Sequence, residues 1–107
     1  MPDNQSDPNL DLLPLREDDH IRGGANPEIT VVEFGDYECP ACRDAYSVIK
    51  KIESELGDRL RFVFRHFPYA GIHPHAEPAA QAAEAAGDQG RFWEMHDLLF
   101  ENQEALE

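Results

Sequence analysis

The sequence predicts an α/β fold built on two parallel strands joined by a helix. Residues 28–34, EITVVEF, are β-branched and apolar, which is typical of a strand, and residues 59–67, RLRFVFRHF, form a second such run. Between the two runs, apolar residues recur at helical spacing over residues 40–56. A strand, a helix and a strand of these lengths make a βαβ unit, whose crossover is right-handed almost without exception.

The first strand is apolar on both faces apart from one acid, Glu33. Such a pattern indicates a central strand of a parallel sheet, with helices above and below it. The helix after it begins at Pro40, in the first helical position, where the missing N–H of proline is no loss. Gly57 ends this helix, because glycine accepts the left-handed conformation of a C-terminal cap.

The rest of the chain adds a leader, a loop and further helices. Residues 1–20 are polar, acidic and interrupted by prolines, and are expected to be a flexible leader, while residues 22–27, RGGANP, are expected to be a loop. An alanine-rich helix is expected over residues 77–87, and a helix with a wide apolar face over residues 92–100. The chain of 107 residues thus forms one domain, residues 21–107, behind the leader.

The composition excludes several classes of function. The chain carries 22 Asp and Glu against 9 Lys and Arg, a formal charge of -13, so its surface repels nucleic acid and anionic membranes. No segment approaches the roughly 20 apolar residues of a membrane span, so we expect no membrane insertion. The first residues lack the regions of a secretion signal, so a cytoplasmic protein is expected. A reducing compartment favours a catalytic or metal-binding cysteine pair over a permanent structural disulfide.

The two cysteines of the chain, Cys39 and Cys42, follow the first strand at the start of the helix. With Cys39 at the N-cap, its sulfur lies near unpaired N–H groups and the positive end of the helix dipole, which favours the reactive thiolate. Cys42 lies three residues later on the same face, one turn further in and more shielded. This arrangement predicts that Cys39 attacks a disulfide and that Cys42 resolves the mixed disulfide.

Glu33 is the third candidate catalytic residue. It interrupts the apolar strand six residues before Cys39, where a carboxylate is costly to bury. A buried acid with a raised pKa beside the shielded thiol could exchange a proton with Cys42 during the reaction. Four neighbours complete the predicted site, the first two shaping access to Cys39 and the last two tuning its acidity: Tyr37, Glu38, Pro40 and Ala41.

Other interpretations of the cysteine pair stay open. A zinc site would need four ligands, and two cysteines with two histidines could supply them: Cys39, Cys42, His73 and His75. The two histidines are spaced more tightly than in zinc fingers, and no second cysteine pair follows, which makes zinc the weaker alternative. Covalent haem attachment is disfavoured because Arg43 stands where a histidine would be required. A non-catalytic interaction module with the same fold is the other alternative.

Four segments carry a resemblance to a known family: ITVVEFGDYECPAC, FVFRHFP, HPHAEPAAQAAEAA and GRFWEMHDLLF. Together they resemble the thioredoxin-fold oxidoreductases of the DsbA-like group, from Asp19 onwards, and in particular the soluble domains fused to some sodium/proton antiporters. The resemblance implies a nucleophile at Cys39, a resolving thiol at Cys42 and a proton-transfer acid at Glu33. It also implies that the alanine-rich helix and the helix after it begin the helical insertion of the thioredoxin fold.

Members of that family continue with more helix, a loop with a cis-proline, two antiparallel strands and a final helix. The resemblance therefore implies that this chain holds a thioredoxin-like half-fold, the βαβ unit with the start of the insertion, and lacks the C-terminal ββα part. The later prolines, Pro68, Pro74 and Pro78, precede or begin the insertion, so none of them takes the place of the cis-proline.

The sequence as a whole predicts a thiol–disulfide oxidoreductase that exchanges disulfides with protein or small-molecule thiols through Cys39 and Cys42. It predicts no cofactor beyond this redox-active disulfide, and no metal. A homodimer is also expected. The second strand would keep an unpaired edge, and the last helix would expose more apolar surface than a half-fold covers.

Overall fold

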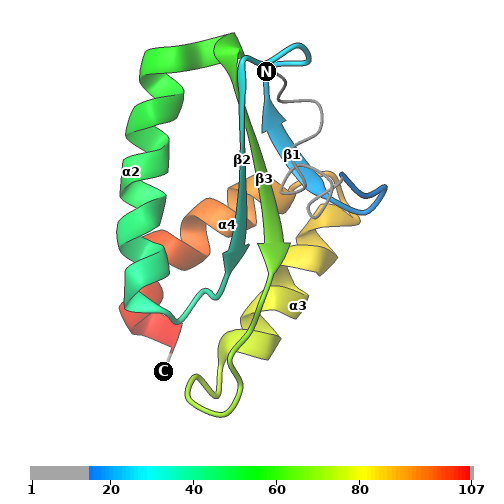
Figure 1. The fold of residues 1–107 in the computed structure, drawn as a ribbon. Helices are drawn as coiled ribbons and strands as arrows, with labels where there is room; N and C mark the ends of the chain where they lie inside the picture. Colours follow the sequence, from blue (N-terminus) through cyan, green and yellow to red (C-terminus); the bar gives the residue numbers. More distant parts are fainter. Residues whose placement is uncertain (1–14, 107) are drawn as a thin grey trace, which may run out of the picture.

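The computed structural model describes residues 15–106 of the chain. Its strands form one sheet in the order β1-β3-β2 (Figure 1), with β1 at His20–Gly23, β2 at Ile29–Gly35 and β3 at Leu60–His66. β2 and β3 are parallel, as the sequence predicts, and β1 runs antiparallel to β3. The centre of the sheet is therefore β3, and the expectation that β2 is the central strand is wrong for the described residues.

The helix predicted between the parallel strands is α2, Pro40–Leu56, and it has the predicted bounds. Cys39 occupies its N-cap, and Pro40 lies in its first turn. Gly57 follows the last helical residue with a φ of 55° and donates its backbone N–H to the carbonyl of Glu53. A positive φ costs glycine little, which is why this residue type ends the helix here. The short helix η2, Gly57–Arg59, then leads into β3.

After β3 the chain passes through a loop into α3, Ala76–Gly87, α4, Phe92–Glu101, and the short helix η3, Gln103–Leu106. Figure 1 shows α4 passing behind the strands from α3 and bringing η3 next to the N-terminal end of α2. No helix within residues 15–106 is long and apolar enough to cross a lipid bilayer.

One hydrophobic core joins the sheet to α2, α3 and α4. Phe62 and Phe64 of β3 point to the same face, because side chains alternate along a strand, and both are almost fully buried. Their neighbours come from all of these helices: Tyr46, Ala79, Ala83, Phe92 and Phe100. Burying a phenylalanine stabilises a fold by about 1.5–3 kcal/mol relative to leaving it exposed. The helices therefore cover the same face of the sheet.

The opposite face of the sheet differs from the sequence prediction of helices on both sides. Ile21 of β1 and Phe34 of β2 lie on this face and remain 42% and 44% exposed. On the same face, Arg65 of β3 forms a buried ion pair with Asp19 at 2.7 Å. The apolar pattern of β2 suggested burial on both faces, but the described helices turn back across one face only.

The predicted leader and the loop after it are partly built into the fold. Residues 1–14 lie outside the described part of the chain. Asp19, however, is held by Arg65, and His20 opens β1, which also takes up Arg22 and Gly23 of the predicted loop. Sequence reasoning missed β1 because so short a segment of mixed polarity carries little strand signal, and its pairing with β3 decides its conformation.

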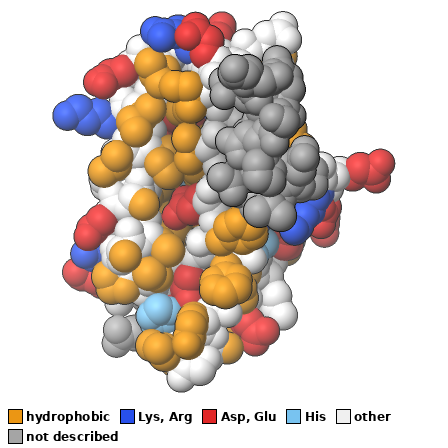
Figure 2. All heavy atoms as spheres, viewed as in Figure 1, with side chains coloured by type: hydrophobic (Ala, Val, Ile, Leu, Met, Phe, Trp, Pro, Cys, Tyr) orange, Lys and Arg blue, Asp and Glu red, His pale blue; other side chains and the backbone are white. Residues whose placement is uncertain are grey.

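The structure contradicts both arguments for a dimer, the unpaired edge of the second predicted strand and the exposed apolar surface of the last predicted helix. β3 has a strand on each side, so the free edge predicted for it does not exist. In α4, Phe92 and Phe100 are buried against the sheet, and Leu98 is the large apolar residue of this helix that stays exposed. The edge strands within residues 15–106 are β1 and β2 instead. Figure 2 shows hydrophobic side chains gathered over α2 and β2.

Candidate active site

The loop between β2 and α2 carries the cysteines and starts from a close contact. Gly35 ends β2 against Phe64, and a Cβ at this position would lie 2.2 Å from Phe64 Cε1. Glycine permits this approach because it has no side chain. The chain then turns over residues 36–38 and enters α2 through Cys39.

Asp36 fixes this loop through its carboxylate. One oxygen accepts a hydrogen bond from the backbone N–H of Glu38 at 2.8 Å, and the other accepts from Tyr69 N and His73 Nδ1, each also at 2.8 Å. Burial alone would raise the pKa of Asp36, but these hydrogen bonds outweigh it and hold the pKa below its usual range. The ionised carboxylate thus ties the cysteine loop to the loop after β3.

Gln103 of η3 holds the same loop from the other side. Its side-chain amide donates hydrogen bonds to the backbone carbonyls of Tyr37, at 2.8 Å, and Cys39, at 3.0 Å. The Cys39 carbonyl also accepts the backbone N–H of Arg43 at 3.0 Å, which opens the hydrogen-bond ladder of α2. The backbone at Cys39 is therefore fixed by a helix and by a distant side chain.

Cys39 has the N-cap position that the sequence predicts, with extended backbone angles of φ -77° and ψ 120°. It is partly accessible, and no side chain of the described residues caps the helix in its place. The backbone N–H groups of the first helical turn, which have no partner within the helix, lie at this end of α2.

Cys42 lies one turn further along α2 and packs against the core. Burial raises the pKa of the Cys42 thiol to about 11. A hydrogen bond with the Asp36 backbone lowers this pKa, but by less than burial raises it. A hydrogen bond to Cys39 and the negative charges of Cys39 and Glu33 raise it further. Cys42 therefore keeps its proton at neutral pH.

Glu33 of β2 lies close enough to Cys42 for its charge to affect that thiol. It stands opposite Phe64 in the strand register and so points to the face that the helices cover. Burial raises the pKa of Glu33 to about 7, and its charge is felt at the Cys42 thiol. A carboxyl group with this pKa can both accept and release a proton near neutrality.

Tyr37 does not line the approach to Cys39, as the sequence suggested, but lies in the core. It is 1% exposed, and its hydroxyl shares a hydrogen bond of 3.0 Å with His96 Nδ1. Burial raises the pKa of Tyr37 and lowers that of His96 to about 3, so both the phenol and the imidazole are neutral at pH 7. The buried side chain of Tyr37 thus anchors the loop before α2 in the hydrophobic core.

The other predicted neighbours surround the entrance. Pro40 and Ala41 are exposed in the first turn of α2. Glu38 turns toward the start of α3, where it accepts hydrogen bonds from the backbone N–H and from Nδ1 of His75. Together with the loop after β3 these residues line a hollow of about 340 Å³ beside the helix N-terminus, formed by Glu38, Pro40, Ile72, His73, Pro74 and His75.

The ligand set of the zinc alternative is not brought together. His73 Nδ1 bonds to Asp36, and His75 bonds to Glu38. Within residues 15–106, the grouping of His, Cys, Asp and Glu side chains close enough to share a metal ion lies elsewhere, on β1, β3 and α3.

Sequence reasoning missed Asp36, Gln103 and His96. Asp36 carried a usable signal, since an aspartate two residues before the hydrogen-bonded N–H is typical of an Asx turn. Gln103 and His96 carried none, because they lie 64 and 59 residues from the groups that they bind, Cys39 and Tyr37.

A family model described as Thioredoxin matches residues 15–107. The chain belongs to the thioredoxin family. This confirms the α/β thioredoxin-like fold and the family resemblance that the sequence indicated.

Relatives of this thioredoxin-family chain carry antiporter names. It is 48% identical over 96 residues to Na(+)/H(+) antiporter NhaA 1 of Salinispora arenicola, a match that covers 89% of the chain and 15% of that protein. It is 46% identical over 97 residues to Na(+)/H(+) antiporter NhaA 1 of Mycolicibacterium vanbaalenii, covering 90% of the chain and 16% of that protein. The chain thus spans a small part of the length of these relatives.

Solved structures similar to the chain are thioredoxin-like. A thioredoxin-like oxidoreductase from Silicibacter pomeroyi superposes with a TM-score of 0.71 and 32% identity, over 79% of this chain and 47% of that one. Oxidised BdbD from Bacillus subtilis superposes with a TM-score of 0.66 and 35% identity, over 78% of this chain and 46% of that one. At the level of the family, these neighbours support a redox enzyme.

Proposed function

We propose that this chain acts as a thiol–disulfide oxidoreductase, with Cys39 as the attacking and Cys42 as the resolving thiol. The observation that carries the proposal is the asymmetry of the pair. Cys39 is accessible at the helix N-terminus, whereas burial holds the pKa of Cys42 at about 11. Two thiols in such different surroundings suit the two successive roles of disulfide exchange.

The reaction begins at Cys39. Its thiolate attacks one sulfur of a substrate disulfide, which forms a mixed disulfide and releases the other substrate sulfur as a thiolate. Cys42 then transfers its proton to the Glu33 carboxylate, and its sulfur attacks Cys39 Sγ. The mixed disulfide breaks, the substrate leaves with both sulfurs reduced, and the protein holds a Cys39–Cys42 disulfide. The reverse sequence oxidises a substrate dithiol.

Protein or small-molecule thiols and disulfides are the proposed substrates. The hollow beside Pro40 adjoins the entrance to Cys39 and is bordered by Ile72, one of the most exposed large apolar residues. An extended peptide or a small disulfide could rest there with its sulfur against the helix N-terminus. The printed names of the solved neighbours, a thioredoxin-like oxidoreductase and BdbD, are in line with this class of chemistry.

The proposal is tested by trapping the intermediate. Cys42→Ser leaves the attacking thiol and removes the resolving one, so a mixed disulfide with a glutathione-disulfide or peptide-disulfide probe should accumulate and be visible by mass spectrometry. Cys39→Ser should form no such adduct. Reduction of the probe by the unaltered protein supports an enzyme, whereas a folded protein without turnover or adduct would favour the non-catalytic interaction module.

Self-association is proposed through β2. Its outer edge has no strand partner within residues 15–106, and Phe34 at its end is 44% exposed. Unpaired strand edges recruit other strands, and a symmetric pairing of two copies would cover both. The cytoplasmic location and the expectation of no cofactor other than the cysteine pair stay predictions of the sequence.

A further inference from the structure

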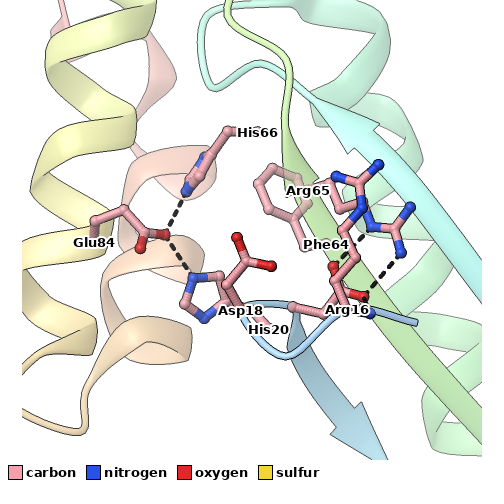
Figure 3. A pocket seen from close by; sticks show the side chains of 8 residues that line it. Arg16, Asp18, His20, Phe64, Arg65, His66 and Glu84 are labelled. Atoms are coloured by element: carbon pink, nitrogen blue, oxygen red, sulfur yellow. Dashed lines mark hydrogen bonds and ion pairs between the residues drawn. The ribbon is translucent and has the colours of Figure 1, made fainter. Parts of the chain in front are cut away.

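Three titratable side chains from different elements meet on the sheet face that α3 covers (Figure 3). His20 Nε2 of β1 lies 2.5 Å from Glu84 Oε2 of α3, and His66 Nε2 of β3 lies 2.8 Å from the same oxygen. The two ring nitrogens and the carboxylate oxygen all lie within 4.8 Å of one another. None of these side chains has a part in the proposed disulfide exchange.

The strand register brings the two histidines together. His20 stands opposite Phe64 in the β1–β3 ladder, and His66 follows Phe64 by two residues along β3. All of these side chains therefore point to the same face. Glu84 follows the buried Ala83 on α3 and reaches both rings from the helix that lies over this face.

Aromatic neighbours fix the orientation of both rings. His20 stacks on Phe92 with the ring centroids 3.5 Å apart and an angle of 2° between the planes. His66 meets the edge of Phe64 at 5.5 Å and that of Tyr37 at 5.9 Å. The two imidazoles thus hold their Nε2 atoms toward Glu84 from rigid elements, which is the preorganisation that a ligand site needs.

We propose that His20, His66 and Glu84 form a binding site for a zinc-type divalent transition-metal ion. Two imidazole nitrogens and a carboxylate oxygen are a ligand set that zinc, cobalt and nickel accept. Zinc holds such atoms at about 2.0–2.2 Å, so the two nitrogen–oxygen distances of 2.5 and 2.8 Å would widen to about 3.3 Å. Each imidazole would bind the ion through an unprotonated Nε2 and carry its ring proton on Nδ1, so the ion would take the place of the hydrogen bonds that now join the rings to Glu84.

The hollow beside these side chains has space for the ion, and the net negative charge of the chain favours a cation. The cluster opens into a hollow of about 230 Å³, whose lining also includes Asp18, Asp19, Arg16 and Arg65. Arg65 and Asp19 neutralise each other in their ion pair, and the chain as a whole carries a formal charge of -13. The hollow gives space for water as a fourth ligand, which is the coordination of an open rather than a closed zinc site.

The surroundings of His66 Nδ1, the ring nitrogen that does not face Glu84, affect how tightly the metal ion would bind. Nδ1 is buried and has no hydrogen-bond partner among residues 15–106. Histidine ligands usually donate this N–H to an acceptor, and losing that support weakens metal binding by about 10- to 100-fold. We therefore expect moderate rather than very tight binding, with exchange of the ion during dialysis against a chelator.

The test uses the full chain with Cys39→Ser and Cys42→Ser, so that the cysteines cannot bind the metal themselves. Titration with Zn²⁺ by calorimetry should give one ion per chain, and Co²⁺ should give visible absorption of a four- or five-coordinate site. Glu84→Gln on this background should weaken Zn²⁺ binding at least about tenfold. Glu77→Gln, an exposed acid of the same helix, is the matched control and should bind as the parent does.

A second measurement keeps the test independent of folding. In the protein with Cys39→Ser and Cys42→Ser, Zn²⁺ should shift the ring-nitrogen NMR signals of His20 and His66. The signals of the other histidines should stay in place: His73, His75 and His96. Circular dichroism of each variant shows whether it is folded. Absence of saturable Zn²⁺ and Co²⁺ binding, equal affinity in folded Glu84→Gln and Glu77→Gln, or shifts at other histidines would overturn the site. None of these results depends on the exchange activity of the cysteines.

Discussion

The side-chain amide of Gln103 donates a hydrogen bond of 3.0 Å to the backbone carbonyl of Cys39, across 64 residues of chain. The same amide donates to the carbonyl of Tyr37 at 2.8 Å. The end of the described chain therefore reaches back to the loop that carries Cys39. The Gln103 amide and the Asp36 carboxylate together restrain the loop that leads into α2.

Gln103→Ala should lower the free energy of unfolding by about 1–2 kcal/mol, because two backbone carbonyls lose their side-chain donor. Asn102→Ala is the matched control, since the Asn102 amide donates only to Leu98 of its own helix, and we expect a loss of about 0.5 kcal/mol. Urea unfolding followed by circular dichroism measures both. Equal losses in the two variants would show that the contact with the cysteine loop contributes nothing of its own.

Cys39 should react with iodoacetamide much faster than Cys42 in the reduced protein near neutral pH. Burial holds the pKa of Cys42 at about 11, so only about one molecule in ten thousand carries its thiolate at pH 7. Brief alkylation followed by peptide mapping gives the ratio of the two adducts. Comparable labelling of both cysteines would remove the basis for assigning them different roles.

Glu33→Gln should slow the resolving step of exchange at neutral pH. Burial places the pKa of Glu33 at about 7, so in the unaltered protein the rate of resolution should rise with pH through this value as the carboxylate forms. Glutamine cannot accept the Cys42 proton, and the inflection should disappear. Stopped-flow measurement of mixed-disulfide decay from pH 5 to 9 gives both profiles. If the two coincide, Glu33 takes no part in proton transfer.

The same substitution should stabilise the fold, in a way that depends on pH. The pKa of Glu33 is raised from 4.5 to about 7 on folding, so the folded protein binds this proton more tightly than the unfolded chain. The stability that this proton confers is present below about pH 4.5 and is lost as the pH rises to about 7.

The advantage of Glu33→Gln should therefore grow across this range and reach about 1–3 kcal/mol above it. Glu55→Gln, on the exposed surface of α2, is the control and should change the stability little at any pH. Urea unfolding at a series of pH values gives the difference. A constant offset from pH 4 to 9 would contradict the burial of Glu33.

Tyr37→Phe should destabilise the protein by about 1–2 kcal/mol, because the buried His96 Nδ1 loses its hydrogen-bond partner. Tyr69→Phe removes a hydroxyl from a side chain that is 54% exposed and should change the stability by less than about 0.5 kcal/mol. Thermal or urea unfolding distinguishes the two. Similar stabilities would mean that water replaces the phenol and that Tyr37 is not sealed in the core.

The chain should sediment as a dimer at micromolar concentration, and Phe34→Lys should shift it toward the monomer. A lysine at this position places a charge at the end of the unpaired β2 strand, which opposes strand pairing. Val48→Lys, on exposed α2, is the control and should leave the association unchanged. A compact 12.1 kDa species for the unaltered chain would rule out the dimer.

The sequence by itself determined the elements whose signals are local. α2 begins at Pro40 and ends before Gly57 as predicted, because proline, glycine and a helical apolar period act within a few residues of one another. The strands β2 and β3 follow from β-branched runs, and the position of Cys39 at a helix N-cap follows from their junction with α2. Each of these features is set by neighbouring side chains and backbone preferences.

Only the tertiary structure decided the sheet order and the contacts around the site. β1 is a strand because β3 pairs with it, and that pairing removes the free edge that the sequence assigned to β3. The burial of Tyr37 and the hydrogen bond from Gln103 to Cys39 likewise join residues that are far apart in the chain. Such contacts leave no periodic pattern in the sequence, because their geometry exists only once the helices have packed on the sheet.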